Sequence, residues 1–576
     1  MNKVFIWILI ISFSLLFTKI SSANNSNYGF FQKPVKEKIK DKDPVKEKNK
    51  DKDEDKERFK IQMTSAWVRY IDEDYYGALR IYRKLYENNK EHSTLNFRMG
   101  KCFIELNEMD TALTHLKMAY KQNPPVSNEI HFLFGKAYQY LGDLQSAINS
   151  YYNYKATLSP RQNERHAVNI LLRQCSIAKE LMENPVNVQI NNLGKNVNTK
   201  YTDACPSISA DAKTLIFTSR RPENIGGKID LFTEEYYDDV YISNWNAEKK
   251  EWSVAENIGA PINTEAHNAN MSITPDGNKI FIYKNVIGET KSGDIYISEK
   301  TPTGEWGVPK AFANENKYIN TTYFESSACL SSDGKTLYFV SEREKEGFGH
   351  GDVYVSHKEG REWTKPVNLG PIINTEGDEI GVYIHPDNKT LFFSSNGHNT
   401  MGGHDIFMSL LSNDGKWSEP INMGYPINTT QEEIHFVFTA DRQMAYLSSS
   451  RNEGHGKMDV YAVNMAYYFK NNTQIDENMA STITGPPLAI LKGSVVDGES
   501  SEALVANLLI KDLSNNKTKI TSSNKNGNYF ITLPSDRKYE ITVKNKNYKP
   551  LVVKFKLPKN DGEIPTMVKH LFLNKK

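Results

Sequence analysis

Five copies of one pattern of apolar and polar positions lie between Asn192 and Asn464. Each copy has a short apolar segment, a turn with an aspartate, a second apolar segment, a Gly-rich loop, and then Asp, an aliphatic residue and Tyr or Phe. The turn aspartates are Asp211, Asp276, Asp333, Asp387 and Asp441, and the later ones are Asp239, Asp294, Asp352, Asp405 and Asp459. Four strand-like segments in a repeat of 54 to 65 residues predict a β-propeller.

A second signature places two asparagines six residues apart, the later one followed by Thr. Its copies are Asn192/Asn198, Asn257/Asn263, Asn314/Asn320, Asn368/Asn374 and Asn422/Asn428. The first copy precedes the first turn aspartate, and no copy follows the last Asp-x-aromatic unit. This offset predicts that a strand near residue 190 completes the last sheet, since an open ring would leave an unpaired edge. We expect five blades over residues 188–466, or six if 464–486 forms a degenerate blade.

Upstream of this region the apolar period becomes helical from about Gln62. Small residues recur there at intervals of 34 or 35, namely Ala78, Ala112 and Ala147, together with Gly100 and Gly135. The pattern resembles the tetratricopeptide repeat, in which small residues let paired helices approach closely. A further helix, about Gln162 to Met182, has one apolar face and is expected to cap the array. The resemblance implies a helical domain at 62–185 whose groove binds peptides or partner helices, unless the array simply docks on the propeller.

The C-terminal part returns to the alternation of period two that is typical of strands. After a polar linker at 467–486, residues 487–576 contain about seven short apolar segments. Asn526-Gly527 is expected to form a tight turn before the strand at 529–533. The segments predict a small β-sandwich. They resemble the carboxypeptidase-regulatory-like domain, a transthyretin-type fold without chemistry of its own.

The N-terminus has the features of an exported protein. Lys3 precedes an apolar run from Val4 to Phe17, and Ala23 is suited to cleavage, so we expect a signal peptide at 1–23, with an uncleaved anchor as the alternative. Residues 24–61 are mostly Lys, Asp and Glu and are expected to form a charged disordered linker, helical at most in part. The net charge of +1 gives no reason to expect nucleic-acid binding.

One loop of the propeller region differs from its counterparts. Asp211 and Asp239 are 28 residues apart, whereas the corresponding pairs in the later copies are 18 or 19 apart. The excess lies in the loop from Arg221 to Tyr237. A single odd loop in a repeat array is a common place for function, although it is also tolerated as plain surface elaboration. The candidate partner-binding residues are Arg221, Glu234, Glu235, Tyr236, Tyr237 and Asp238.

Other conspicuous residues favour structural roles. His350, His404 and His455 lie in different Gly-rich turns, and no loop offers three convergent ligands, so we expect turn residues rather than a metal site. Trp252, Trp306, Trp363 and Trp417 are expected to pack between blades. Cys102, Cys175, Cys205 and Cys329 are expected to be free thiols, because their spacing suits no zinc site. The sequence has no nucleophile elbow, phosphate loop or zinc-protease motif, so no catalytic residue, metal or cofactor is predicted.

The order of these parts carries a broader resemblance. Residues 331–341 (SSDGKTLYFVS) and 293–298 (GDIYIS) resemble the WD40-like repeat of TolB-type propellers. Helical repeats, such a propeller and a regulatory-like sandwich together resemble envelope proteins that include the periplasmic component of the type IX secretion and gliding machinery. That component also has an OmpA-like peptidoglycan-binding domain. No such segment follows the sandwich in residues 487–576, so we do not expect peptidoglycan binding.

The resemblance implies a non-catalytic scaffold rather than an enzyme. Its location would be the periplasm, or the outer membrane as a peripheral protein, of a Gram-negative bacterium. Other envelope proteins would bind to the helical groove and to the faces of the propeller. The alternative is a module that binds a small ligand, peptide or glycan in the propeller channel.

Overall fold

The computed structural model describes residues 44–165, 167–231, 233–284, 293–312, 318–343, 347–471, 486–560 and 563–576. The chain divides into two compact units, the first ending at Asn169 and the second starting at Ile170. The predicted signal peptide at 1–23, the first part of the predicted linker 24–61, and most of the segment 464–486 lie outside the described residues. Across the described residues, no helix combines the length and the apolar character needed to cross a bilayer.

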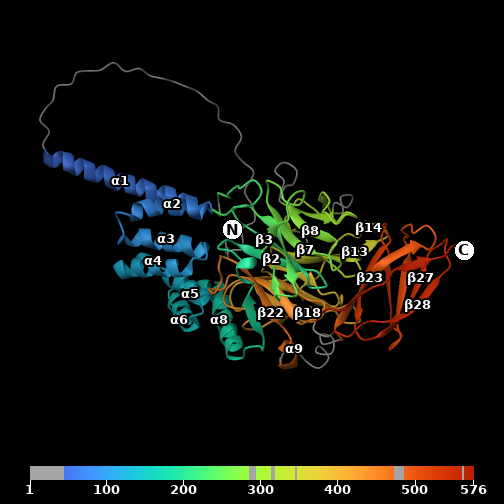
Figure 1. The fold of residues 1–576 in the computed structure, drawn as a ribbon. Helices are drawn as coiled ribbons and strands as arrows, with labels where there is room; N and C mark the ends of the chain where they lie inside the picture. Colours follow the sequence, from blue (N-terminus) through green and yellow to red (C-terminus); the bar gives the residue numbers. More distant parts are fainter. Residues whose placement is uncertain are drawn as a thin grey trace, which may run out of the picture. The chain divides into compact units, whose positions relative to one another are not determined.

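The first unit is helical (Figure 1). Its elements are α1 (Pro44–Ile71), α2 (Tyr75–Tyr86), α3 (Ser93–Glu105), α4 (Met109–Gln122), the 3-10 turn η1 (Pro124–Val126), α5 (Ile130–Tyr140), α6 (Leu144–Lys155) and α7 (Pro160–Arg165). The helices pack as successive pairs, α1 with α2, α3 with α4, and α5 with α6. A Cβ atom on Gly100 would lie 2.7 Å from the side chain of Leu116, and one on Gly135 would overlap the ring of Tyr151. The recurrent glycines therefore mark the points where paired helices touch.

Helix α1 extends into the predicted linker 24–61. It starts at Pro44, so the later part of that segment is helical, as the partly helical alternative allowed. Proline suits the first turn of a helix, and the Lys and Glu residues that follow are good helix formers. At the other end of α1, Met63 and Ala66 are buried in the core of the first unit. Propensity and this anchored end together extend the helix into the charged segment.

Five antiparallel sheets form most of the second unit. The first sheet has β2 (Asp203–Ile208), β3 (Thr214–Ser219), β4 (Asp239–Asn246), β5 (Glu251–Trp252) and β6 (Glu256–Asn257), and the second has β7 (Asn268–Ile273), β8 (Lys279–Lys284), β9 (Asp294–Glu299) and β10 (Lys310–Ala311). The third has β11 (Glu325–Leu330), β12 (Thr336–Ser341), β13 (Asp352–Glu359), β14 (Glu362–Trp363) and β15 (Val367–Asn368), and the fourth has β16 (Glu379–Ile384), β17 (Thr390–Ser395), β18 (Asp405–Leu410) and β19 (Ile421–Asn422). The fifth has β20 (Glu433–Phe438), β21 (Met444–Ser449), β22 (Asp459–Asn464) and β1 (Gln189–Asn192), and the 3-10 turn η2 (Gly194–Asn196) follows β1.

The first strands of the five sheets form a closed ring. β2 contacts β7 and β20, β11 contacts β7 and β16, and β16 contacts β20. β1 pairs antiparallel with β22, with Ile190 opposite Val463. The fifth sheet thus takes its outer strand from the start of the unit, which confirms the closure that the asparagine offset predicted. The arrangement is propeller-like (Figure 1).

Apolar residues fill the spaces between adjacent sheets. One cluster joins Phe217 of the first sheet to Tyr446 of the fifth, and another joins Tyr338 of the third to Phe407 of the fourth. Trp252 packs against Tyr446 with 5.9 Å between ring centroids. Trp417 packs against Tyr338 in the same way, at 6.1 Å. The packing role predicted for these two tryptophans is confirmed.

Two helices lie beside the ring. α8 (Val168–Glu183) crosses the boundary between the units, and within the second unit Gln174 Nε2 donates to Thr400 Oγ1 at 2.8 Å. The helix that was predicted to cap the repeats thus contacts the loop after β17. α9 (Tyr468–Asn471) follows β22, and Tyr468 is buried beside Met423. The predicted linker 467–486 therefore begins with residues that belong to the core of the ring.

The last part of the chain forms two facing sheets. One contains β23 (Leu488–Asp497), β26 (Asn528–Pro534), β29 (Thr566–Val568) and β30 (Leu571–Leu573), and the other contains β24 (Asn507–Asp512), β25 (Thr518–Ser522), β27 (Lys538–Lys544) and β28 (Leu551–Lys556). Leu488 and Ile490 of β23 pack against Ala210 and Ala440 of the ring. These alanines lie in the turns that join the first strand of a sheet to its second strand. The sandwich therefore contacts the end of the ring that carries these turns, which we call the turn face.

Candidate functional site

The end of the ring opposite the turn face is the candidate for a site. We call it the loop face: it consists of the loops that join second to third strands and of the segments that lead into the first strands. The predicted insertion, Arg221 to Tyr237, lies there because it joins β3 to β4. The turn face already contacts the sandwich, where Thr532 Oγ1 donates to the carbonyl oxygen of Pro386 at 3.2 Å.

Arg221 and Asp238, two of the six predicted partner-binding residues, are buried in ion pairs. Arg221 Nη2 lies 3.0 Å from Asp203 Oδ1. Asp238 accepts from Arg220 Nε at 2.8 Å and lies 2.7 Å from His267 Nδ1. Burial acts to raise the pKa of Asp238, but Arg220 and His267 together outweigh it and lower that pKa. Their charges are paired inside the ring, so these two residues expose little surface, and their contact with a partner stays a prediction.

The other four predicted residues are Glu234, Glu235, Tyr236 and Tyr237. Glu235 pairs with Arg220 and, at 3.2 Å, with Lys457 Nζ. Tyr237 stacks on His267 with 4.0 Å between ring centroids. Tyr236 is half-buried, and Glu234 is exposed. Internal contacts therefore fix the insertion, while apolar side chains project from it: Ile229 is 48% exposed and Leu231 is 77% exposed.

The later asparagine of each repeated pair holds the third strand of a sheet. Asn263 accepts the N–H of Val240 at 2.9 Å and donates to its carbonyl oxygen at 2.8 Å. It also donates to Asn257, which donates to Asp239, both at 2.7 Å. Equivalent bonds to the strand join Asn198 to Val460, Asn320 to Ile295, Asn374 to Val353, and Asn428 to Ile406. The signature is thus a strand clamp rather than a binding motif.

The aspartates near the turn histidines bind backbone groups. Asp352 accepts the N–H of Phe348 at 2.6 Å, Asp405 that of Met401 at 2.9 Å, and Asp459 that of His455 at 2.5 Å. These aspartates thus stabilise the Gly-rich turns in which the histidines lie. Among the described residues, no group of three or more His, Cys, Asp or Glu side chains is placed to hold a metal ion. The four cysteines are free thiols.

A set of carboxyl groups at the start of the first strands was not identified from the sequence. Its members are Asp203, Glu325, Glu379 and Glu433. A threonine four residues upstream binds each one, as Thr375 does through its N–H at 2.8 Å and its hydroxyl at 2.7 Å from Glu379. Arginines pair with Glu325 and Glu433 at 3.4 Å, whereas Gly397 stands at the equivalent position beside Glu379. The spacing Thr-x-x-x-acid, present in four of five copies, is the signal that could have revealed them.

Glu379 has a perturbed acidity but no access to a substrate. Burial raises its pKa to about 7. A carboxyl group with such a pKa could serve as a general acid or base. However, Thr375 and Ser395 donate to its oxygens, with Ser395 Oγ at 2.6 Å, and the side chain is fully buried. Its role is therefore structural.

A cysteine and a histidine meet where the first strands β2 and β20 approach each other. Cys205 Sγ lies 3.6 Å from His435 Nδ1. Burial raises the pKa of Cys205 to about 12 and lowers that of His435 to about 4. At neutral pH the pair consists of a thiol and a neutral imidazole. A cysteine nucleophile needs the thiolate, so the pair is not activated for catalysis.

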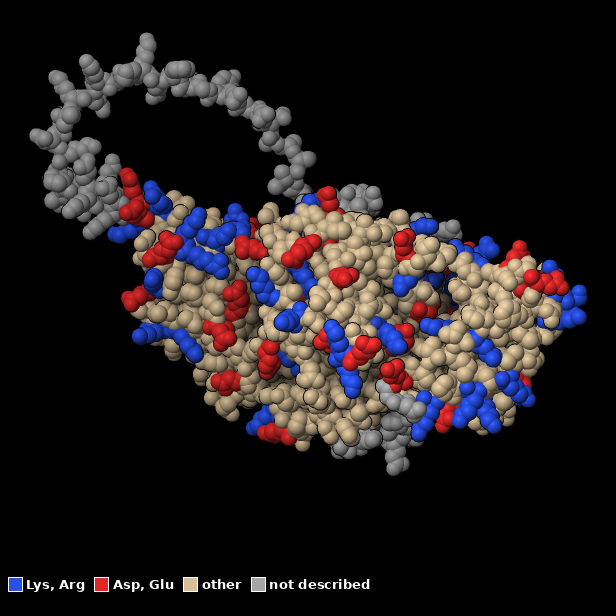
Figure 2. Space-filling view, viewed as in Figure 1, with Lys and Arg blue, Asp and Glu red and all other residues tan. Residues whose placement is uncertain are grey.

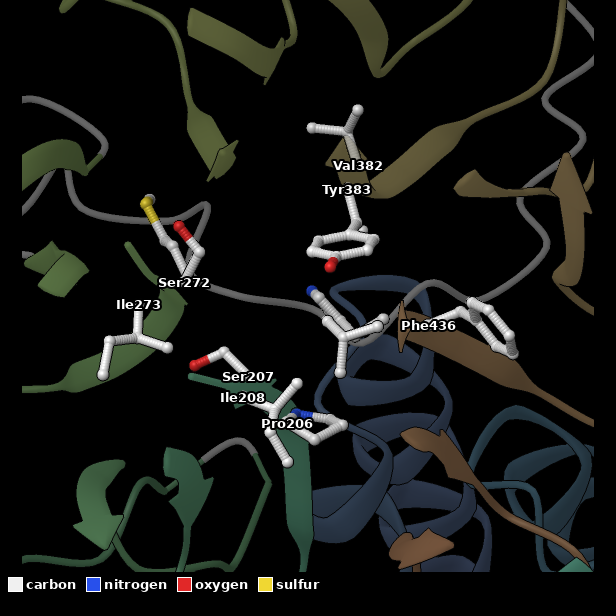
Figure 3. Close-up of a pocket in the computed structure, with 12 residues that line it drawn as sticks. Pro206, Ser207, Ile208, Ser272, Ile273, Val382, Tyr383 and Phe436 are labelled. Carbon is white, nitrogen blue, oxygen red and sulfur yellow. The ribbon is translucent and has the colours of Figure 1, made fainter. Parts of the chain in front are cut away.

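The ring encloses a small central cavity. Residues of β2, β7, β16 and β20 line it, and Figure 3 shows Ser207, Ser272 and Tyr383 around it. Its volume is about 10 Å³, room for about one water molecule. Tyr383 lies beside it, and its hydroxyl donates to the carbonyl oxygen of Phe438 on the neighbouring strand β20 at 2.7 Å. The alternative function, a ligand in the channel, therefore receives no support from the geometry.

Replacing Gly381 by alanine should lower the free energy of unfolding by about 2 kcal/mol. The φ angle of Gly381 is +61°, and a Cβ atom there would lie 2.8 Å from the backbone nitrogen of His435, so β16 would move away from β20. Gly334 is the matched control, because its φ is +68° but a Cβ atom on it would meet nothing within 4 Å. Urea denaturation should give a cost of about 1 kcal/mol for Gly334→Ala. If both replacements lowered the free energy of unfolding equally, β16 and β20 would tolerate being moved apart.

Comparisons with known proteins show limited similarity. No family model and no curated protein matches the chain. Among solved structures, the chain is similar to an α-L-arabinofuranosidase from Lactobacillus brevis, with 13% identity over 49% of this chain and 93% of that one, at a TM-score of 0.32. It is also similar to a periplasmic gluconolactonase of Pseudomonas aeruginosa, with 11% identity over 45% and 85% of the two chains, at a TM-score of 0.26.

A shorter match involves a 3-chlorocatechol 1,2-dioxygenase from Rhodococcus opacus. It has 10% identity and a TM-score of 0.14, and it covers 16% of this chain and 61% of the dioxygenase. The names of all three proteins are those of enzymes. Identities and TM-scores of this size support no inference about the activity of this chain.

Proposed function

We propose that this chain is a non-catalytic scaffold of the cell envelope, an accessory part of a secretion or motility complex of the type IX kind. Its parts are a tetratricopeptide-type helical domain, a five-bladed TolB-like propeller and a carboxypeptidase-regulatory-like sandwich. The chain is exported to the periplasm, where it binds other envelope proteins through the helical groove and the loop face, and it associates peripherally with the outer membrane.

The observation that carries this proposal is the exposed apolar rim of the loop face. Ile229 and Leu231 project from the first sheet's insertion, and Phe348 from the corresponding loop of the third sheet is 49% exposed. Beneath them, charged groups such as Arg220 and Asp238 are already paired. Apolar side chains held by rigid, internally satisfied loops are typical of protein interfaces. Such side chains bury apolar surface when a partner binds, and no ion pair has to be broken.

The test is partner capture from intact cells by crosslinking and mass spectrometry, with the tagged full-length chain. Ile229→Asp combined with Leu231→Asp should reduce recovery of the partners of the loop face at least tenfold. Val308→Asp is the control, since Val308 is 71% exposed but lies in the segment before β10. Deleting 64–183 should remove a second set of partners. Identical partner lists for all variants would contradict the proposal.

A further inference from the structure

The charge of the chain is unevenly distributed, although its total is near zero. Residues 487–576 contain 15 Lys and one Arg but only eight Asp and Glu, a net charge of +8. The whole chain has 71 basic and 70 acidic residues, so residues 1–486 have 55 and 62, a net charge of −7. Figure 2 shows blue side chains gathered over the end of the second unit that carries β27 and β28. The sandwich is therefore a cationic module on an anionic chain.

The lysines are concentrated at one end of the sheet β25-β24-β27-β28. Lys544 ends β27, and Lys546 and Lys549 lie in the turn before β28; all three are exposed. The C-terminal residues join them: Lys549 N donates to Asn574 O at 2.9 Å, and Lys576 Nζ donates to the carbonyl oxygen of Lys546 at 2.9 Å. These contacts with the backbone hold several lysines of the turn and of the C-terminus close together.

An aliphatic row crosses the outer face of the same sheet. Strand register places Ile520 opposite Leu509, Leu509 opposite Thr542, and Thr542 opposite Val552. Ile520 is 54% exposed and Val552 is 55% exposed. On β27 and β28 the row is flanked by Lys544 on one side and by Lys554 on the other, since residues two apart on a strand share a face. Lys554 Nζ lies 3.6 Å from Glu540 Oε2 on that face, so the unpaired positive charge is at the Lys544 end. The face thus combines exposed aliphatic side chains with lysines around them.

We propose that this face of the sandwich binds the surface of an anionic lipid bilayer. Four neighbouring strands present a surface about 14 Å wide. Because the surface is this wide, its partner must offer negative charge over an extended area rather than at single points. A bilayer with anionic headgroups does so, while the aliphatic row enters the interfacial region and the lysine ammonium groups reach the phosphates. The inference rests on the proposed function in one respect: it identifies the surface through which the proposed peripheral association with the membrane would occur.

The test is co-sedimentation of the purified full-length chain with vesicles of phosphatidylcholine containing 30% phosphatidylglycerol. Each lysine near an anionic bilayer contributes about fivefold to affinity. The variant Lys544→Gln, Lys546→Gln, Lys549→Gln and Lys576→Gln should therefore bind at least roughly 30-fold more weakly. The matched control replaces the exposed ring lysines Lys213, Lys249, Lys335 and Lys416 by Gln and should bind like the unmodified chain.

Two further measurements distinguish binding to a bilayer from binding to an acidic protein. Vesicle binding should fall by at least tenfold between 50 and 500 mM NaCl, because salt screens exposed charges. Val552→Ser should weaken it severalfold, whereas Val308→Ser should not. Equal binding to pure phosphatidylcholine, or equal loss in both lysine variants, would overturn the proposal. Binding of polyglutamate without binding of vesicles would overturn it too and would assign the face to an acidic protein. None of these results depends on partner capture, so the proposed scaffold function can fail or stand independently.

Discussion

Replacing Asn198 by alanine is expected to lower the free energy of unfolding of the second unit by about 3 kcal/mol. Asn198 accepts the N–H of Val460 at 2.9 Å and donates to its carbonyl oxygen at 2.8 Å. It also donates to Asn192 Oδ1 at 2.8 Å. Alanine would leave the buried N–H of Val460 unsatisfied, which costs about 1–3 kcal/mol. It would also remove one of two hydrogen bonds to the Val460 carbonyl oxygen, which would keep the bond from the N–H of Leu193 at 3.2 Å. The measurement is urea denaturation followed by far-UV circular dichroism and tryptophan fluorescence.

Two control variants separate the clamp from the closure of the ring. Asn191 lies on the same strand β1 but is exposed, so Asn191→Ala should change the free energy of unfolding by less than about 0.5 kcal/mol. Asn374 makes the same bonds to Val353 in the third sheet, at 2.8 and 3.0 Å, and Asn374→Ala should cost as much as Asn198→Ala. A cost below about 1 kcal/mol at Asn198 alone would mean that β1 is dispensable for closing the ring.

The repeat made this part of the fold predictable. Five copies of the asparagine pair, one of them displaced to Asn192, carry the information that β1 belongs beside β22. The displaced copy indicates which two distant strands pair, whereas the apolar pattern of one strand alone does not identify its partner. The same periodicity predicted the turn aspartates and the tryptophans between sheets, because their neighbours recur with them.

Residues without a repeating context could not be placed from the sequence. Arg221 and Asp238 lie in a long polar loop and were expected at the surface, but ion pairs with Asp203 and Arg220 hold them inside the ring. Those partners are 18 residues away in each case, and no local pattern links them. A charged residue in an unusual loop can therefore be exposed and contact a partner protein, or be buried in an ion pair. The two cases differ only in whether a distant residue of the chain pairs with it.

The cationic face of the sandwich was missed for another reason. The total charge of +1 hides the +8 of residues 487–576, because the acidic residues upstream compensate it. A count for each predicted domain would have revealed the excess. The clustering at Lys546 and Lys576 would still have required the structure, since it depends on contacts between the β27–β28 turn and the C-terminus.

Replacing Glu379 by glutamine should stabilise the second unit at pH 8 by about 2–3 kcal/mol and at pH 5 by only about 1 kcal/mol. Burial raises the pKa of Glu379 to about 7, well above the value of about 4.3 in an unfolded chain. The folded state therefore keeps a proton that the unfolded chain loses. This contribution to stability is fully present below about pH 4 and is lost as the pH rises through about 7. Glutamine keeps the shape of the protonated acid and removes the ionisation.

Glu433 occupies the same position in the next sheet but has an arginine partner. Burial raises its pKa as well, and Arg451 acts against this rise. Arg451 Nη2 lies 3.4 Å from Glu433, and Arg451 Nε donates to Ser449 Oγ at 2.9 Å. Glu433→Gln would leave the half-buried guanidinium without its carboxylate and should destabilise the unit at pH 8 by about 3 kcal/mol. Thermal unfolding of both variants between pH 5 and pH 8 measures the two effects. If Glu379→Gln were destabilising at pH 8, burial could not be holding a proton on Glu379, and the cause assigned to its raised pKa would be wrong.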